Sequence, residues 1–518
     1  MTQDLPIPAA KLSASQCRPK SHGRRWPWLS GNGYLANVAA YCGTSVISQA
    51  ALAIQGFVVR RFIAPQLLGI WNLVAVFQSF LGTFDPGITT AAFRELAVLN
   101  GTGNQAEATT VRSTALWSRI GYSIVLASVL LYKGHDKTGV YALGLLAGAT
   151  ITVLSATSES FVTFYQSAQE YVRLSRATLT YSLSAATLLS LGAWLGGIYG
   201  LIGTALVGGM IQLGLLVALR PKALAVRPTW SWAALKRLIA FGLPFRLVDY
   251  PGSLMAILDV LWIGRFLNPG ALAIYVTARS LLNLAVDIPA RMGSVFISRI
   301  CNVGAVPERR PGLAKELSAF LLVQYLVIFP VIIIGIGAMM SLLVRSFLPS
   351  YAAAVPVLRW LLLAIYFVPQ TTIVRNFWML DKRLVSLGVT NLVGLAATAT
   401  SIFVSTTVNG GTLPSLARGT VVGYALYYTC VMFTAGREVW GLKHAAYLVV
   451  HAVGSALVLG WISAGPAQRV VTGDWAAALH DLTFSLARNF AIVTPLLLYG
   501  GSTLRVFLNT RTWQRAEV

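Results

Sequence analysis

The sequence carries little charge for its size. Asp, Glu, Lys and Arg make up 11% of its 518 residues, whereas 56% are hydrophobic. Soluble domains carry about 25% charged residues. The apolar residues gather in runs of roughly 20–25, long enough to cross a hydrocarbon core as helices. Backbone in lipid must satisfy its own hydrogen bonds, and the runs lack the short alternating pattern of barrel strands. These features predict an all-α polytopic membrane protein.

Cysteine is also scarce, and the motifs of common enzymes are missing. The four cysteines are scattered along the chain, so no disulfide framework or metal-ligand spacing is visible. Metalloprotease, serine hydrolase and Walker-type signatures are absent as well. We therefore expect no metal, no cofactor and no enzymatic activity. The net charge of +23 is better explained by membrane topology than by nucleic acid binding.

The apolar runs predict about fourteen membrane-spanning helices. Basic residues gather in every second connection, with roughly 25 on one side of the membrane and about 10 on the other. Because cytoplasmic loops are enriched in Lys and Arg, this bias places both termini in the cytoplasm and supports an even number of spans. The predicted spans are 34–59, 66–92, 112–132, 139–165, 175–196, 199–219, 238–264, 271–298, 316–343, 353–379, 385–407, 413–435, 444–464 and 484–507.

A short internal repeat divides the chain. Residues 57–75 read FVVRRFIAPQLLGIWNLVA, and residues 261–279 read LWIGRFLNPGALAIYVTAR. The segments align without a gap, so that Arg61 falls on Arg265. Each copy connects the first and second helix of a six-helix set, and an even number of spans separates the copies. The halves then have the same orientation, so we predict two pseudo-symmetric six-helix bundles plus a C-terminal helix pair.

This repeat and the basic segments give the predicted domain organisation. The polar, basic amino terminus is expected to lie at the cytoplasmic headgroups. The predicted parts are a cytoplasmic basic tail (1–33), an N-terminal six-helix lobe (34–220), a cytoplasmic linker (221–237), a C-terminal six-helix lobe (238–436), an additional transmembrane helix pair (437–510) and a cytoplasmic tail (511–518).

Charge inside a membrane is expensive, so charged residues within the spans are the first candidates for function. Span 238–264 carries Arg246 and Asp249 on one helix face, between Pro244 and Pro251. Proline interrupts helical hydrogen bonding, so we expect a kink or a break there. Broken helices that carry charges are a recurrent form of transporter site. The alternative is a structural ion pair.

Further arginines lie in other spans. Asp287 and Arg291 stand four residues apart and are expected to form a structural pair. Arg279 has no acid three or four residues away, so we expect it to be unpaired and to face a wet or anion-filled cavity. Arg119 and Arg375 are weaker candidates, because either can extend its side chain to the headgroups at the inner membrane surface.

Buried acids are candidates for binding a coupling proton or cation. They are Asp85, Glu159 and Asp259, together with Asp249 of the pair described above. Asp85 is followed by a proline and a glycine, which loosen a helix. We therefore keep open that Asp85 marks a hinge or a helix cap and binds no ion.

These features together resemble a known family. The tandem six-helix halves, the RF-x-x-P-x-x-L-x-I-aromatic loop and the Asp-Pro-Gly end of the second span are similar to those of polysaccharide transporters. So is the D-x-x-x-I-G-R-F…Y-x-x-A-R stretch from Asp259 to Arg279. These proteins are the Wzx-type flippases of the multidrug/oligosaccharidyl-lipid/polysaccharide exporter superfamily. The resemblance covers about residues 34–435 in topology and two short stretches in sequence.

The resemblance implies a flippase that moves undecaprenyl-diphosphate-linked oligosaccharide repeat units across the bacterial inner membrane. It implies a role in exopolysaccharide or lipopolysaccharide O-antigen synthesis, by alternating access coupled to an ion gradient. The implied partners are membrane lipids and the polysaccharide polymerase and glycosyltransferases of the same pathway. Planar guanidinium groups bind diphosphates in bidentate fashion, so the candidate substrate ligands are Arg246, Arg279, Arg375 and Arg119.

Two other functions stay open. A multidrug or toxic-compound cation antiporter of the same superfamily should place acids in its cavity, and an unpaired Arg279 argues against it. A membrane glycosyltransferase or polysaccharide polymerase acting on the same lipid carrier needs catalytic carboxylates on a large outer loop. Only Asp474 and Asp481 are available for that role, in the short connection 465–483.

Overall fold

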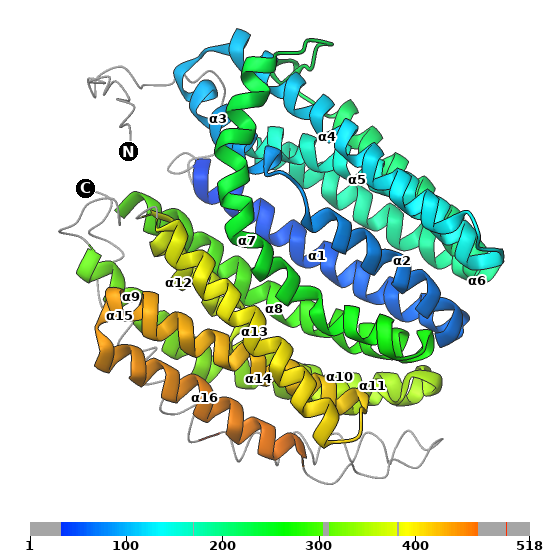
Figure 1. Ribbon diagram of the computed structural model, residues 1–518, viewed down its shortest axis with the longest axis vertical. Helices are drawn as coiled ribbons and strands as arrows, with labels where there is room; N and C mark the ends of the chain where they lie inside the picture. The colour runs from blue at the N-terminus through cyan, green and yellow to red at the C-terminus, as the bar shows by residue number, and fades with distance from the viewer. Residues whose placement is uncertain (1–32, 169, 304–309, 381–382, 465–493, 495–518) are drawn as a thin grey trace.

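The computed structural model describes residues 33–168, 170–303, 310–380, 383–464 and 494. Within these ranges the chain forms helices and no strand, which confirms the predicted all-α fold (Figure 1). The helices are α1 (Gly33–Phe62), α2 (Pro65–Thr83), α3 (Ile88–Thr102), α4 (Gln105–Gly134), α5 (Gly139–Ser167), α6 (Tyr171–Ala218), α7 (Trp232–Phe266), α8 (Pro269–Val303), α9 (Arg310–Val323), α10 (Phe329–Phe347), α11 (Ala354–Leu361), α12 (Val368–Leu380), α13 (Leu384–Val408), α14 (Leu413–Val431), α15 (Arg437–Trp440) and α16 (Leu442–Ala464).

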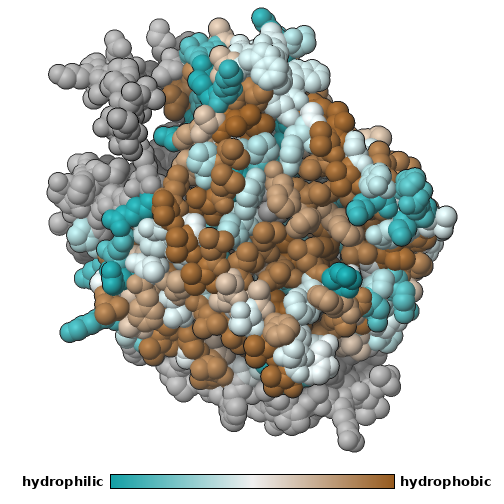
Figure 2. All heavy atoms as spheres, in the orientation of Figure 1, coloured by the Kyte–Doolittle hydropathy of each residue, from teal (hydrophilic) through white to brown (hydrophobic). Residues whose placement is uncertain are grey.

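Nine helices in the described ranges are long and apolar enough to cross a membrane. Figure 2 shows that apolar side chains cover most of the visible face between more hydrophilic margins. Both observations fit a polytopic membrane protein. The number of fourteen spans stays a prediction, because 484–507 lies outside the described residues.

Helix α6 contains two of the predicted spans. Its backbone leaves helical geometry at Gly197, where φ is 55°. Gly192 and Gly200 then lie so close that a Cβ atom on Gly192 would be 2.6 Å from the Gly200 carbonyl oxygen. In a straight helix these residues would be about 12 Å apart. The chain therefore folds back at Gly197, and the two halves of α6 correspond to the spans predicted at 175–196 and 199–219.

The predicted span 66–92 is divided into α2 and α3. The helix stops at Phe84 because Pro86 has no amide hydrogen to continue the ladder. Gly87 then takes a left-handed conformation, with φ of 78°, and precedes α3. The hinge considered for Asp85 is thus a complete break between two helices. As a consequence, Asp85 lies in an extended turn between them.

Helices α1 and α3 to α6 pack mainly on one another, whereas α2 packs mainly on α8, and α7 to α14 form a second group. The two groups meet where α2 contacts α8 and α7, and where α3 and α4 contact α7. Glycine allows two of these contacts to be very close. A Cβ atom on Gly69 would lie 1.9 Å from the Pro269 carbonyl oxygen, and one on Gly242 would lie 2.3 Å from that of Gly87. We keep the predicted domain bounds as a proposal that this grouping supports.

The C-terminal part of the chain is described only to residue 464, apart from residue 494. Helix α16 packs against α9, α11 and α15. It occupies the place of the predicted span 444–464. Its expected partner helix, and the basic tail before Gly33, fall outside the described residues.

Candidate functional site

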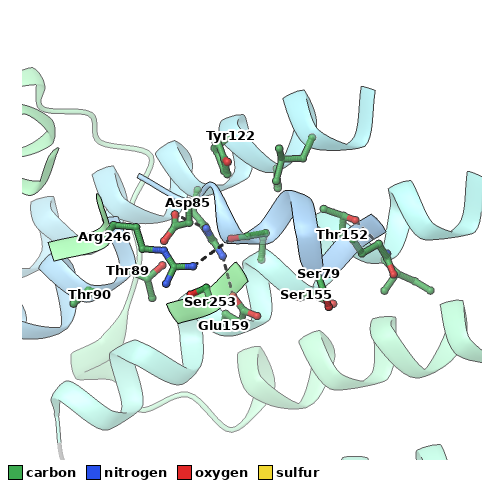
Figure 3. Close-up of a pocket in the computed structure, with 17 residues that line it drawn as sticks. Ser79, Asp85, Thr89, Thr90, Tyr122, Thr152, Ser155, Glu159, Arg246 and Ser253 are labelled. Carbon is green, nitrogen blue, oxygen red and sulfur yellow. Dashed lines mark hydrogen bonds and ion pairs between the residues drawn. The ribbon is translucent and has the colours of Figure 1, made fainter. Parts of the chain in front are cut away.

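A cavity of about 540 Å³ lies between α2, α4, α5 and α7. We call it the arginine cavity, because Arg119 and Arg246 project into it. Figure 3 shows Asp85, Glu159 and Arg246 converging within it. Its other polar lining residues come from five helices and include Gln78, Ser79, Thr89, Thr90, Tyr122, Ser123, Thr152, Ser155 and Ser253.

Arg119 is held by two carboxylates. Its Nη1 donates to Asp85 Oδ1 at 2.5 Å, and its Nη2 donates to Glu159 Oε2 at 2.9 Å. The side chains of Arg119 and Asp85 are 11% and 9% exposed, whereas that of Glu159 is 61% exposed. Arg119, a substrate-binding candidate for which a headgroup contact was the alternative, is therefore a buried bridge between two candidate acids.

The break between α2 and α3 positions Asp85. Helix geometry would have directed its side chain along the α2 surface, but the turn at Pro86 and Gly87 releases it toward α4. The Tyr250 hydroxyl donates to the Asp85 carbonyl oxygen at 3.1 Å, which ties this turn to α7. Because Asp85 binds Arg119, its charge affects how strongly the Arg119 guanidinium can bind a ligand in the cavity.

Arg246 and Asp249 form the predicted pair on α7, with 3.5 Å between Nη1 and Oδ2. The pair has a third member, because Arg375 on α12 donates to Asp249 Oδ1 at 3.1 Å. Helix α7 remains helical through Pro244 and Pro251, so the predicted break is absent. Figure 1 shows a change of direction along α7, as expected for the kink.

Helix α13 holds this part of α7 in place. The Asn391 side-chain amide donates to the Val248 carbonyl oxygen at 2.9 Å, next to the Leu247 carbonyl that Pro251 leaves without its helical donor. The Tyr427 hydroxyl donates to Asn391 Oδ1 at 2.7 Å. The kinked turn that carries Arg246 and Asp249 is thereby supported by α13 and α14.

The charges in this region balance. Arg119 is paired with Asp85 and Glu159, and Asp249 lies between Arg246 and Arg375. Three guanidinium groups thus face three carboxylates. A strongly anionic ligand gains from these arginines only if it replaces a carboxylate partner or if that carboxylate takes up a proton.

The prediction that Arg279 is unpaired is wrong. Its guanidinium forms an ion pair with Asp259 on α7 and also donates to the Ala256 carbonyl oxygen. Twenty residues separate the partners in sequence, but the α7–α8 hairpin places them side by side. Asp259 is 2% exposed and also accepts from the Tyr275 hydroxyl at 2.7 Å. Neither Arg279 nor Asp259 lines the arginine cavity.

The pair expected between Asp287 and Arg291 lies on α8. The side chain of Arg291 falls outside the described residues, so this pairing stays a prediction. In the described ranges no three His, Cys, Asp or Glu side chains gather closely enough to hold a metal ion.

The sequence did not point to the uncharged residues of the cavity. Tyr122, Thr152, Ser155 and Ser253 line it beside the arginines. Hydroxyl side chains are frequent in membrane helices, where they usually serve packing or bond to their own helix. Thr152, for example, donates to the Gly148 carbonyl oxygen at 2.8 Å. Only the packing of α4, α5 and α7 around one space distinguishes these residues from the others.

Comparisons with solved structures define the class of fold. A lipid II flippase, MurJ, in an inward closed conformation aligns with 90% of this chain and 99% of its own, with a TM-score of 0.60 and 11% identity. A Vibrio cholerae MATE transporter aligns with 80% of this chain and 99% of its own (TM-score 0.59, 12% identity). A eukaryotic MATE transporter aligns with 80% of this chain and 100% of its own (TM-score 0.54, 15% identity). At these identities the likeness concerns the fold, which is that of the MurJ and MATE transporters.

The family follows from the sequence profile. The profile of the polysaccharide biosynthesis protein family matches residues 58–356, more than half of the chain. No curated protein matches the chain significantly. The chain belongs to the polysaccharide biosynthesis protein family, as its resemblance to polysaccharide transporters predicted. It is a multi-pass membrane protein of that family.

Proposed function

We propose that this protein is a flippase for undecaprenyl-diphosphate-linked oligosaccharide repeat units. It acts in the bacterial inner membrane, with both termini in the cytoplasm, in exopolysaccharide or O-antigen synthesis. The membership of a polysaccharide biosynthesis family supports the substrate class. The fold shared with the lipid II flippase supports movement of a lipid-linked head by alternating access.

The observation that carries the proposal is that Arg119 and Arg246 line one cavity, with Arg375 linked to Arg246 through their shared partner Asp249, outside the cavity lining. A diphosphate linkage presents several oxyanions, which suit bidentate guanidinium groups. The hydroxyl and amide side chains around the arginines suit the hydroxyl groups of sugars. The lipid tail stays in the bilayer, because the arginine cavity is polar and has no room for a long apolar chain.

The paired carboxylates give a route for ion coupling. Glu159 and Asp249 are the more exposed acids of the site, at 61% and 39% of their side chains. When the diphosphate arrives, it takes their place beside Arg119, Arg246 and Arg375, and the released carboxylates accept protons or a cation. Release of the substrate reverses the exchange. Binding of the substrate therefore favours binding of the coupling ion, because both require the same arginine–carboxylate pairs to separate.

A cation antiporter is the second candidate, and the fold of the MATE transporters supports it. The unpaired Arg279 expected from the sequence no longer argues against it, because that residue is paired. The balance of three acids and three arginines suits a cation less well than an excess of acids would. A polymerase or glycosyltransferase remains as the third candidate, and its residues Asp474 and Asp481 lie outside the described part of the chain.

The side of the membrane on which intermediates collect distinguishes a flippase from a polymerase. Cells that lack the protein should accumulate lipid-linked repeat units on the cytoplasmic leaflet, where impermeant periodate does not oxidise them. Complementation with the wild type should clear them, and Arg246→Gln should not. The exposed Arg265→Gln serves as the matched control, because it changes an arginine on the same helix at its far end. Accumulation on the outer leaflet would contradict the proposal.

A further inference from the structure

A second cavity, of about 450 Å³, lies on the other end of α2, between α1, α6 and α8. We call it the Arg60 cavity. It differs from the arginine cavity in charge, since none of the described residues that line it is an acid. Its polar lining residues include Gln49, Gln55, Arg60, Asn72 and Asn283. One guanidinium group and four amides therefore face a single space.

Arg60 binds only neutral partners in the described structure. Its Nε donates to the Thr277 hydroxyl at 2.8 Å, and its Nη2 donates to the Ser280 hydroxyl at 3.3 Å. The third bond, from Nη1 to the Gly56 carbonyl oxygen at 2.8 Å, is within α1. A partly buried cation without a counterion is costly, and an oxyanion in the cavity would offset that cost.

A second group in the cavity wall also lacks a partner. The Asn72 side-chain nitrogen is buried and makes no hydrogen bond. A buried donor in that state favours a ligand that brings an acceptor. Trp71, the neighbouring residue, lines the same space. Amides that bind hydroxyl groups, together with an indole ring that packs on an apolar face, suit the two sides of a sugar ring.

One face of α2 connects the two cavities. Trp71 and Asn72 face the Arg60 cavity, whereas Ser79 and Gly82 face the arginine cavity. Residues 68, 72, 75, 79 and 82 recur at helical spacing, so they lie on one side of α2. Ala75, between the two cavities, is small and exposed. The distance along the axis from Asn72 to Gly82 is about 15 Å, which suits an oligosaccharide extended along the helix.

We propose that the Arg60 cavity binds a sugar residue with a negatively charged carboxylate, within the glycan head of the transported molecule. The inference rests on the proposed function, because it places the diphosphate in the arginine cavity and the glycan along α2. The Arg60 guanidinium binds the carboxylate, and Asn72 donates to a ring hydroxyl or to the carboxylate itself. The substrate class is therefore an acidic glycan.

The test uses a pair of small probes that differ only in the carboxylate. Methyl β-D-glucuronide and methyl β-D-glucoside are titrated into the full chain in nanodiscs, with binding followed by calorimetry. We expect the glucuronide to bind at least about tenfold more tightly, as for a hydrogen bond to a charged group, and the preference to fall at high salt. Arg60→Gln should abolish the preference and leave the glucoside affinity unchanged.

Arg61→Gln is the matched control, because Arg61 is the adjacent, exposed arginine and does not line the cavity. It should retain the preference, and Asn72→Leu should weaken both probes. Equal binding of the two probes, binding of neither, or a preference that survives Arg60→Gln would each overturn the inference. Flipping of a neutral lipid-linked glycan in those cases would leave the proposed function standing. If the protein prefers the glucuronide but does not flip any lipid-linked glycan, the Arg60 cavity is a sugar site and the proposed flippase function is wrong.

Discussion

Loss of one partner from the ion pair between Arg279 and Asp259 should destabilise the protein, and the pair should play no direct part in substrate binding. The side chains are 18% and 3% exposed, so the pair is shielded from solvent. Removing one partner of a buried pair costs about 3–5 kcal/mol, since the other charge is left uncompensated. Asp259 keeps hydrogen bonds from the Tyr275 hydroxyl and the Val260 amide, at 2.7 and 2.8 Å. We therefore expect Arg279→Gln to cost about 3 kcal/mol.

A double-mutant cycle tests this expectation. Neutralising both partners, with Arg279→Gln and Asp259→Asn, removes the uncompensated charge and should restore stability to within about 1 kcal/mol of the wild type. The free energy of unfolding is measured by chemical denaturation of the purified protein in mixed micelles. Arg265→Gln, at an exposed position of α7, should change it little. The reasoning is refuted if the double variant is as unstable as the sum of the single variants.

Two further predictions concern the arginine cavity and the contact between the helix groups. Glu159→Gln leaves Arg119 with one carboxylate, so the variant should bind inorganic pyrophosphate more tightly than the wild type does. Calorimetry on the full chain measures this affinity. An unchanged affinity would show that Glu159 has no part in ion coupling. Gly242→Ala adds a Cβ that would lie 2.3 Å from the Gly87 carbonyl oxygen, so it should slow transport without loss of protein. Gly121→Ala, with nothing within 4 Å, is its control, and equal rates for the two variants would contradict the importance of this contact.

Much of the fold could be predicted from the sequence. The apolar runs predicted helices whose bounds agree closely with α5 and α13, whereas α4 and α7 begin six or seven residues before the predicted spans, in segments that contain polar or basic residues. The divided span at Asp85 was only partly anticipated, because Pro-Gly signals a weak point but not whether the helix bends or ends. The reversal at Gly197 was placed correctly, since two apolar runs joined by glycines were too long for one span.

The pairs within the site could be predicted only where they are local. Arg246 and Asp249 lie on one turn of one helix, so sequence spacing was sufficient. Arg119 meets Asp85 and Glu159 through the packing of three elements, which spacing does not encode. The same limit explains the wrong expectation for Arg279, because its partner Asp259 lies on the neighbouring helix, twenty residues away in sequence.

Arg60 is a residue whose surroundings the sequence did not reveal. Its position beside Arg61 at the end of a predicted span gave no sign of an inward-facing side chain, because arginines there usually lie at the headgroups. Its contacts with Thr277 and Ser280 depend on the approach of α1 to α8, more than 200 residues apart in sequence. The internal repeat drew attention to this loop without indicating that one of its two arginines turns inward.

Reconstituted transport distinguishes a flippase from a cation antiporter. Proteoliposomes that contain the purified full chain and a fluorescent undecaprenyl-diphosphate-linked oligosaccharide are treated with an impermeant quencher. For a flippase, we expect the wild type to move the lipid to the opposite leaflet, and we expect Arg61→Gln to do the same, whereas Arg119→Gln and Arg375→Gln should not. We also expect no proton-driven accumulation of ethidium. Accumulation of ethidium by the wild type, without movement of the lipid-linked glycan, would contradict the account and assign the protein to cation antiport.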